Sequence, residues 1–161
     1  MNKDDKNFSK KIILQDCEYM KMAIEMAKKA ERLDEVPVGA VAVRDGMVIA
    51  AAFNTRESSK CATHHAEILA IEQACSVLGG WRLPDVTLYV TMEPCAMCAG
   101  AIINARIPRV VYGCKDLRFG AFGSLINLAE VGLNHKPEVI GGVLEDECRE
   151  LLTNYFRKKR Q

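Results

Sequence analysis

The sequence lacks any long hydrophobic run. No stretch reaches the roughly 18 apolar residues that a membrane-spanning helix needs, and the first residues, Met1–Lys11, are polar and charged, unlike a secretion signal. We therefore expect a cytoplasmic protein without membrane contact. Seven cysteines, an odd number in a chain without a secretion signal, indicate reduced thiols and not a disulfide framework.

An excess of charge is also missing. The net charge is +1, so composition gives no support for nucleic-acid binding, and any such function must depend on local clusters. Repeats and linkers are absent, and 161 residues, nearly half of them hydrophobic, predict one domain with a single large core. We expect a flexible N-terminal tail over residues 1–15 and a single domain over residues 16–161.

Hydrophobic periodicity predicts alternating strands and helices. A helix is expected from about Asp16, its N-cap, to Leu33, and strands at 38–43 and 47–53 flank the hairpin signal Asp45-Gly46. Further helices are expected at 65–78, 95–105 and 145–159, further strands at 86–92, 109–113 and 138–143, and a short helical piece around 125–130. This alternation after an initial hairpin predicts an α/β fold, with a mixed sheet sandwiched by helices.

Two short motifs supply metal-binding side chains, His65-Ala66-Glu67 and Pro94-Cys95-Ala96-Met97-Cys98. Imidazole and thiolate suit zinc, and three protein ligands are typical of a catalytic site with an open fourth position. Pro94 is favoured at a helix start and puts Cys95 and Cys98 on one face of the first turn, where the helix dipole favours thiolate. Glu67 is not needed as a ligand and is suited to proton transfer beside the metal.

Other interpretations of these residues remain open. A lone C-x-x-C also occurs in redox pairs, and Cys61 or Cys114 as a fourth ligand would give a non-catalytic zinc module that binds RNA. His64 makes the ligand ambiguous from spacing alone, but the H-x-E register selects His65. Glu93 is expected to fix a loop and not to catalyse.

The order H-x-E followed by P-C-x-x-C resembles the zinc-dependent cytidine/adenosine deaminase superfamily, also called cytidine/deoxycytidylate deaminases. Within it, the chain is similar to the bacterial tRNA-specific adenosine deaminases from about Asp16 to Arg160, nearly its whole length. The segments that carry this similarity are Val36–Val41, His65–Glu67, Leu88–Cys95, Met97–Ala101, Gly123–Leu125, Leu133–His135 and Glu147–Arg160.

The resemblance implies a three-layer α/β/α cytidine-deaminase-like fold, with a mixed five-stranded sheet in the order 2-1-3-4-5. It implies one Zn²⁺ per chain on His65, Cys95 and Cys98, no organic cofactor, and hydrolysis of adenosine to inosine at the wobble position of an arginine tRNA anticodon. Glu67 would transfer the protons. The Cys95 backbone N–H, at a helix start, would be an oxyanion donor.

Contacts with the nucleoside are implied as well, and each has a simpler alternative. Asn54 follows a strand, where Asn is often only a turn former, and Asn134 carries over in the same way. Pro37 and Val38 would line the base pocket, or they are simply buried in a strand.

Contacts with the RNA would come from two basic segments. Lys115, Asp116 and Arg118 would face the RNA from the loop after a strand, although Leu117 and Phe119 replace residues that are often smaller or polar in the family. Phe156 and Arg157 belong to a basic C-terminal helix that would lie along the anticodon stem-loop. The alternatives are a solvated loop and a bare charged tail.

The resemblance further implies a homodimer with its two sites near the interface. The helix after Cys95 gives weak support, because Ala99, Ala101, Ile102 and Ile103 offer a large hydrophobic face. A deaminase of free guanine, cytosine or cytidine remains the main alternative function. Asn54, Asn134 and the basic C-terminus favour the tRNA enzyme.

Overall fold

The computed structural model describes the backbone of residues 3–161 and the side chains from Ile13 onward. Helix α1 (Lys3–Arg32) begins well before the expected N-cap at Asp16, which is therefore wrong. No proline or glycine interrupts residues 3–32, and Asp16 is buried inside the helix because its carboxylate pairs with Arg109 of a strand. Residues 13–15 of the expected tail are helical; residues 1–2 and the side chains of 3–12 lie outside the described part.

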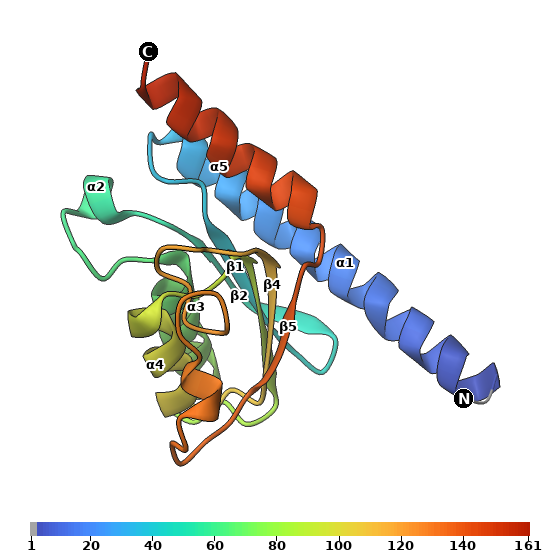
Figure 1. Cartoon of the computed structure of the whole chain (residues 1–161). Helices are drawn as coiled ribbons and strands as arrows, with labels where there is room; N and C mark the ends of the chain where they lie inside the picture. Colours follow the sequence, from blue (N-terminus) through green and yellow to red (C-terminus); the bar gives the residue numbers. More distant parts are fainter. Residues whose placement is uncertain (1–2) are drawn as a thin grey trace.

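Five strands form one mixed sheet (Figure 1). In chain order they are β1 (Gly39–Arg44), β2 (Met47–Phe53), β3 (Val86–Met92), β4 (Arg109–Cys114) and β5 (Glu138–Gly141). β1 pairs antiparallel with β2 and with β3, whereas β3, β4 and β5 are parallel. The order β2-β1-β3-β4-β5 confirms the expected 2-1-3-4-5 arrangement. Asp45 and Gly46 form the predicted hairpin turn with φ of 51° and 75°, the left-handed conformation that such turns require.

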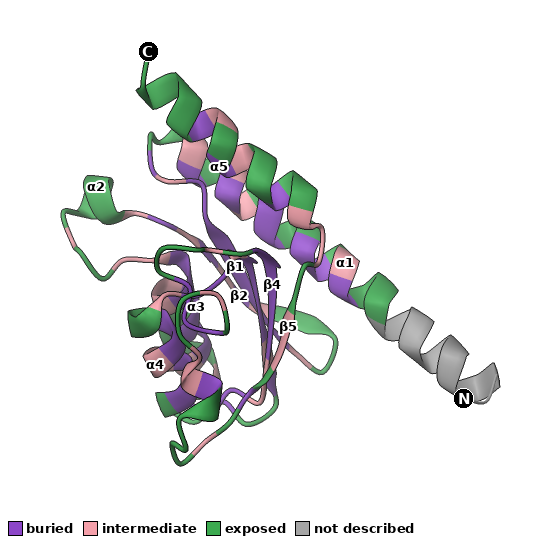
Figure 2. Cartoon of the chain, viewed as in Figure 1, coloured by how far each residue is buried: buried purple, intermediate pink, exposed green. Residues whose placement is uncertain are grey.

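Helices cover both faces of the sheet. α1 and α5 (Glu145–Lys159) contact one face, and α3 (Ala66–Leu78) and α4 (Ala96–Asn104) cover the other, which confirms the three-layer fold. The short helices α2 (Arg56–Ser59) and η1 (Leu128–Glu130) lie in connecting loops. Buried residues concentrate in the sheet and on the inner helix faces (Figure 2), because valine and alanine side chains make up most of the buried strand positions. Among the described residues, no helix combines the length and apolar character needed to span a membrane.

Two glycines allow the helices to approach the sheet closely. A Cβ at Gly39 would lie 2.1 Å from the Ala23 carbonyl oxygen of α1, and one at Gly113 would lie 2.3 Å from Cys148 Sγ of α5. The C-terminal ends of the two helices are also joined, by Lys158–Glu31 and Lys159–Asp34 ion pairs of 2.9 and 2.5 Å.

The ends of β2, β3 and β4 meet at one edge of the sheet together with the start of β1. The Asn54 N–H donates to the Val38 carbonyl over 3.1 Å, and the Glu93 N–H donates to the Cys114 carbonyl over 2.9 Å. The loops that follow these strands, which carry both sequence motifs, therefore leave the sheet at the same edge.

Candidate active site

His65, Cys95 and Cys98 come together at this edge. The His65 Nδ1 atom lies 3.5 Å from Cys98 Sγ and 3.7 Å from Cys95 Sγ. Their three donor atoms all lie within 4.8 Å of one another, an arrangement that can hold a metal ion. The ligands predicted from the two motifs, 30 residues apart in the chain, thus form one cluster.

The two helix starts explain how these side chains are presented. His65 and Cys95 are the N-cap residues of α3 and α4, with extended backbones, so each helix begins one residue later than expected. Neither side chain caps its own helix, which leaves the imidazole and the thiol free to face each other. Cys98 lies in the first turn of α4, as the proline before Cys95 predicts.

The side chains of the cluster shift one another's pKa values. The neighbouring Cys98 thiol and the His65 imidazole lower the pKa of Cys95, whereas the hydrogen bond with Cys95, burial and the nearby Glu67 raise the pKa of Cys98. A hydrogen bond to Cys95 raises the pKa of His65. Glu67 is only 4% exposed, and burial raises its pKa to about 7. A carboxyl group with such a pKa can both accept and donate a proton near neutral pH.

A fourth protein ligand does not join the group among the described residues. The buried Cys114 thiol donates to the Thr91 carbonyl, and Cys61 Sγ lies 3.4 Å from Thr63 Oγ1. His64 also lies outside the cluster. The three-donor arrangement therefore matches an open site and gives no support to a closed structural module.

Asn54 lies beside the cluster. Its Oδ1 accepts a hydrogen bond from the Ala66 N–H over 2.8 Å, next to His65, and its side chain is buried. Its amide NH₂ has no partner among the described residues and is not fully enclosed, so it is available to a ligand. Pro37 and Val38 are also buried, and the Val38 carbonyl accepts a hydrogen bond from the Asn54 N–H.

Glu93 fixes the loop after β4, as expected. Its buried carboxylate accepts hydrogen bonds from the backbone N–H groups of Asp116, Phe122 and Ser124, and from the Ser124 hydroxyl. A Cβ at Gly120 would lie 2.5 Å from this carboxyl group. The loop is thereby held against the start of α4, where the Ala121 N–H donates to the Pro94 carbonyl.

Comparison with known proteins agrees with this site. Residues 14–160 match the family model of MafB19-like deaminases. The chain belongs to this deaminase family. The similarity read from the two motifs is thus confirmed.

Relatives of this deaminase resemble it over most of its length. The tRNA-specific adenosine deaminase of Bacillus subtilis strain 168 is 51% identical over 148 residues, which cover 91% of this chain and 92% of the relative. A solved structure from studies of A-to-I editing by tRNA:A34 deaminases at the wobble position has a TM-score of 0.79 and 43% identity, with 84% and 99% covered. A guanine deaminase from Nitrosomonas europaea has a TM-score of 0.75 and 27% identity, with 85% and 82% covered.

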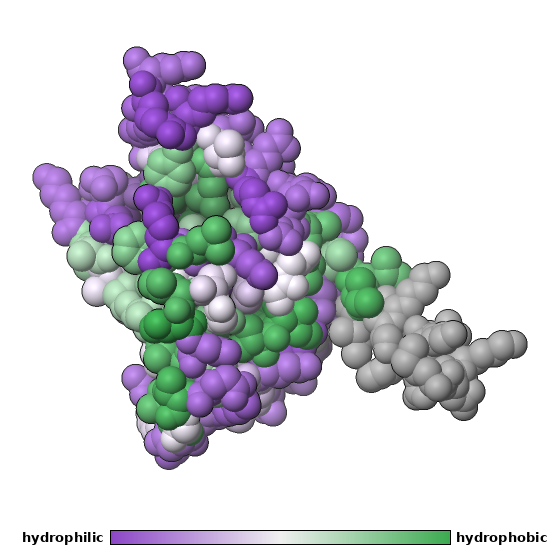
Figure 3. Space-filling model, viewed as in Figure 1, coloured by the Kyte–Doolittle hydropathy of each residue, from purple (hydrophilic) through white to green (hydrophobic). Residues whose placement is uncertain are grey.

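The two basic segments of the deaminase lie in the loop after β4, which leaves the sheet at the same edge as the His65–Cys95–Cys98 cluster, and at the end of α5. Lys115 and Arg118 are exposed, whereas Asp116 shapes the loop, because its Oδ1 accepts from the Arg118 and Phe119 N–H groups. On α5, Phe156 and Arg157 are exposed near the helix end. Figure 3 shows hydrophilic residues over α2 and the C-terminal end of α5, and apolar residues on the face crossed by the loop after β4.

Asn134 of the deaminase does not reach the cluster in the same chain. It is exposed, and the next residue, His135, bonds through Nε2 to the Ile107 carbonyl over 2.7 Å. Ile107 precedes β4, so this loop lies at the edge of the sheet remote from His65. Within a single chain, Asn134 therefore lies away from the cluster, although the resemblance implied that it contacts the nucleoside.

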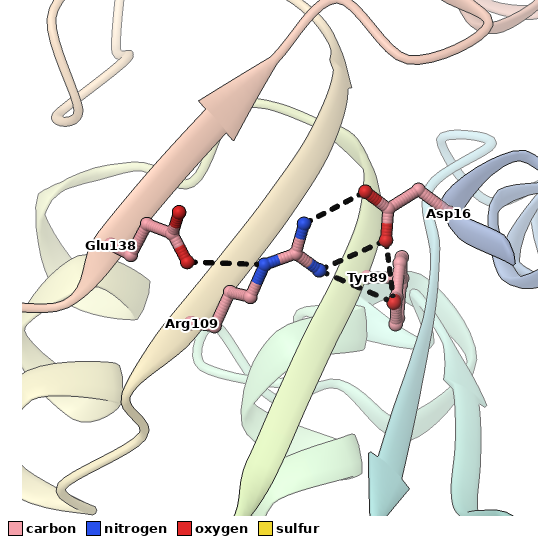
Figure 4. A network of polar contacts seen from close by, with 4 residues as sticks. All are labelled: Asp16, Tyr89, Arg109 and Glu138. Atoms are coloured by element: carbon pink, nitrogen blue, oxygen red, sulfur yellow. Dashed lines mark hydrogen bonds and ion pairs between the residues drawn. The ribbon is translucent and has the colours of Figure 1, made fainter. Parts of the chain in front are cut away.

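Two buried carboxylates of the deaminase, Asp16 and Glu35, have long-range partners that the sequence does not indicate. Asp16 pairs with Arg109 over 2.8 Å and accepts from the Tyr89 hydroxyl, while Arg109 also contacts Glu138 (Figure 4). The Glu35 carboxylate accepts hydrogen bonds from the backbone N–H groups of Glu57 and Ser58, more than twenty residues later in the chain. No local signal identifies either residue, because an acid in a helix or a loop is usually solvated.

Proposed function

We propose that this deaminase hydrolyses adenosine to inosine at the wobble position of a tRNA anticodon, with an arginine tRNA as substrate. The observation that carries this proposal is the open three-donor cluster beside the buried Glu67 carboxyl group. The similarity to the tRNA-specific adenosine deaminase of B. subtilis and to the solved structure from studies of tRNA:A34 deaminases supports tRNA adenosine as the substrate. Free tRNA is available in the cytoplasm, where we place the enzyme.

The cluster fits one zinc ion per chain. Tetrahedral bonds of about 2.3 Å to sulfur and about 2.0 Å to nitrogen put a nitrogen and a sulfur ligand about 3.5 Å apart. The distances of 3.5 and 3.7 Å between His65 Nδ1 and the two thiols match this value. In such a site zinc supplies Lewis-acid activation of water.

Glu67 is the proton carrier in this proposal. Water and adenosine give inosine and ammonia, so one proton must pass from the attacking water to the ring nitrogen and another to the leaving amino group. A carboxyl group with a pKa of about 7 can serve both transfers. The Cys95 N–H precedes the first turn of α4 and is available to stabilise developing negative charge.

The base would be held by the neighbouring residues. The unpartnered amide NH₂ of Asn54 can donate to it, and the buried Pro37 and Val38 form an apolar wall. Lys115, Arg118 and Arg157 would contact the RNA, with Phe156 as a stacking surface. Asp116 supports them by shaping the loop.

A homodimer is also part of the proposal, but the hydrophobic side chains that would form its interface are not the ones expected from the sequence. Ala99, Ile102 and Ile103 of α4 are buried inside the chain, so they do not supply the free hydrophobic face expected from the sequence. Exposed apolar side chains occur instead on the loops that follow β4 and on the outer side of α4: Met97, Leu117, Phe119, Leu125, Ile126, Val131 and Leu133. Burying them against a second copy would bring Asn134 near a site only if that site belongs to the partner. A monomer at micromolar concentration with full activity would contradict this arrangement.

The direct test uses unmodified arginine tRNA. We expect incubation, digestion and nucleoside analysis to give inosine at the first anticodon position, because bases in the anticodon loop are already unpaired and cost less to extrude. The control is the same tRNA with guanosine at that position, which should give none.

The similarity to a guanine deaminase keeps a free-base substrate as the second candidate. Faster release of ammonia from free guanine, cytosine or cytidine than from the tRNA would favour that function. Inosine at another position of the tRNA would contradict the wobble assignment.

A further inference from the structure

The loop between Asn54 and His65 has little packing to hold it. Its helix α2 buries none of its residues. Thr55 is the N-cap residue, but its side chain makes no capping hydrogen bond. The N–H groups at a helix start are satisfied by side chains or by water, and in α2 a side chain from another segment serves two of them.

Glu35 supplies that side chain from the segment between α1 and β1. Its carboxylate accepts from the Glu57 N–H over 3.1 Å, from the Ser58 N–H over 2.7 Å and from the Ser58 hydroxyl over 2.8 Å. Glu57 and Ser58 are the second and third residues of α2, the positions that a capping side chain normally serves. Glu35 is thus a remote cap, 22 residues before the helix that it fixes.

The environment of Glu35 suits an anchor more than a surface acid. The residue is only 1% exposed, and no ion pair to it exists among the described residues from Ile13 onward. Burial acts to raise the pKa of this carboxyl group, but the hydrogen bonds from Ser58 and Glu57 outweigh it and lower the pKa. Charge-assisted hydrogen bonds of this kind are stronger and more directional than neutral ones.

The anchored loop connects the parts of the site. Glu35 lies two residues before Pro37, and the Val38 carbonyl accepts from the Asn54 N–H. At the other end of the loop, the Thr55 N–H donates to the His64 carbonyl over 3.1 Å, just before His65. One carboxylate therefore ties the base-wall segment to the loop that carries Asn54 and the metal-binding histidine.

We propose that Glu35 is a positioning residue for deamination, which acts through the Asn54–His65 loop and does not touch the substrate. This inference rests on the proposed function. Without the carboxylate, α2 would lose its anchor, and Asn54 and His65 would no longer be held in one arrangement. The chemical step should suffer more than tRNA binding, because the cationic residues proposed to contact the RNA lie on other elements.

Glu35→Gln tests this, with Asp16→Asn as a matched control. Both variants replace one buried, hydrogen-bonded carboxylate, but Asp16 lies with Arg109 at the opposite edge of the sheet from His65. We expect both variants to lower the melting temperature. Only Glu35→Gln should lower kcat, by up to the order of 10²-fold, since small misplacements of reacting groups have effects of that size. The KM for tRNA and the zinc content should stay close to those of the wild type.

Hydrogen exchange provides a readout that does not depend on activity. The Glu57 and Ser58 amides should be protected in the wild type although α2 is exposed, and Glu35→Gln should remove that protection. The wild-type measurement stands even if the variant does not fold. An unprotected pair of amides in the wild type, or a Glu35→Gln enzyme with the kcat of Asp16→Asn, would overturn the inference. An inactive wild type would instead reject the proposed function.

Discussion

At the scale of single residues, burial determines what Glu67 and Glu93 can do. Both are buried carboxylates near the same cluster. Glu93 accepts hydrogen bonds from three backbone N–H groups, which leaves it to hold a loop. Among the described residues, no comparable set of backbone N–H groups from other residues donates to Glu67, and burial raises its pKa to about 7. This difference supports the proton-transfer role proposed for Glu67 and the loop-holding role of Glu93.

Glu67→Gln should keep the zinc and the fold but lose turnover. The amide has nearly the same shape but cannot carry a proton, and general acid–base groups contribute about 10²–10⁴-fold to rate. We expect a loss at the upper end of that range, because the same group serves more than one transfer. Metal analysis and single-turnover kinetics on the tRNA measure the two effects separately.

The control for this experiment is Cys98→Ser, which removes a proposed ligand and should lose the metal together with activity. A Glu67→Gln enzyme with a rate near that of the wild type would reject the mechanism. Loss of zinc from Glu67→Gln would instead indicate that Glu67 helps to hold the ion.

At the scale of secondary-structure elements, the parts that the sequence predicts are those with local signals. Asp45-Gly46 predicts the hairpin, and Pro94 predicts the start of α4 to within one residue. Gly79 ends α3 in the left-handed conformation typical of a helix C-terminus. The meeting of His65, Cys95 and Cys98 in one cluster was also predictable, because each belongs to a short motif with its own spacing.

The features that the sequence does not reveal depend on distant partners. The sequence suggests that Asp16 is an N-cap. In the structure Asp16 lies inside the longer helix α1, and its carboxylate pairs with Arg109, which is 93 residues later in the chain. Glu35 looks like a surface acid and instead caps a helix across a gap of 22 residues. Asn134 belongs to a recognisable motif, yet its position relative to the cluster follows from the path of the loop and not from its spacing in the chain.

The contact between α1 and β1 gives a prediction at the same scale. Gly39→Ala should destabilise the protein by an amount at the upper end of the roughly 1–3 kcal/mol typical of overpacking. The added methyl group would meet backbone atoms of Ala23 and Ala27, which cannot rotate away. Denaturant unfolding measures the change.

Gly80→Ala is the matched control, since a Cβ there meets nothing within 4 Å and its φ is not left-handed. Its free energy of unfolding should change by less than about 0.5 kcal/mol, as for most surface substitutions. Equal stability of the two variants would show that α1 and β1 can separate without cost.

At the scale of the whole molecule, the small net charge conceals an uneven distribution. The chain carries +1 overall, and much of its basic C-terminus is already paired, Lys158 with Glu31 and Lys159 with Asp34. Arg157 and Arg160 have no acidic partner among the described residues, and both side chains are exposed near the C-terminal end of α5. Within the basic C-terminus, these two arginines are therefore the cations left free to contact phosphates in the proposed complex with tRNA.

Replacing both arginines by glutamate should lower the affinity for tRNA. It should also make that affinity depend less steeply on the salt concentration. Each phosphate contact on single-stranded RNA contributes a slope of roughly −0.7 to the logarithm of affinity against the logarithm of salt concentration. Loss of two contacts should therefore reduce the steepness of that plot by about 1.4, with zinc content and kcat at saturating tRNA unchanged. The control carries the same charge change on α1, Lys21→Glu with Lys28→Glu, at exposed positions that pair only with neighbours on the same helix. An equal change of slope in the control would mean that the deaminase responds to its net charge, and the proposed RNA surface at the end of α5 would then be wrong.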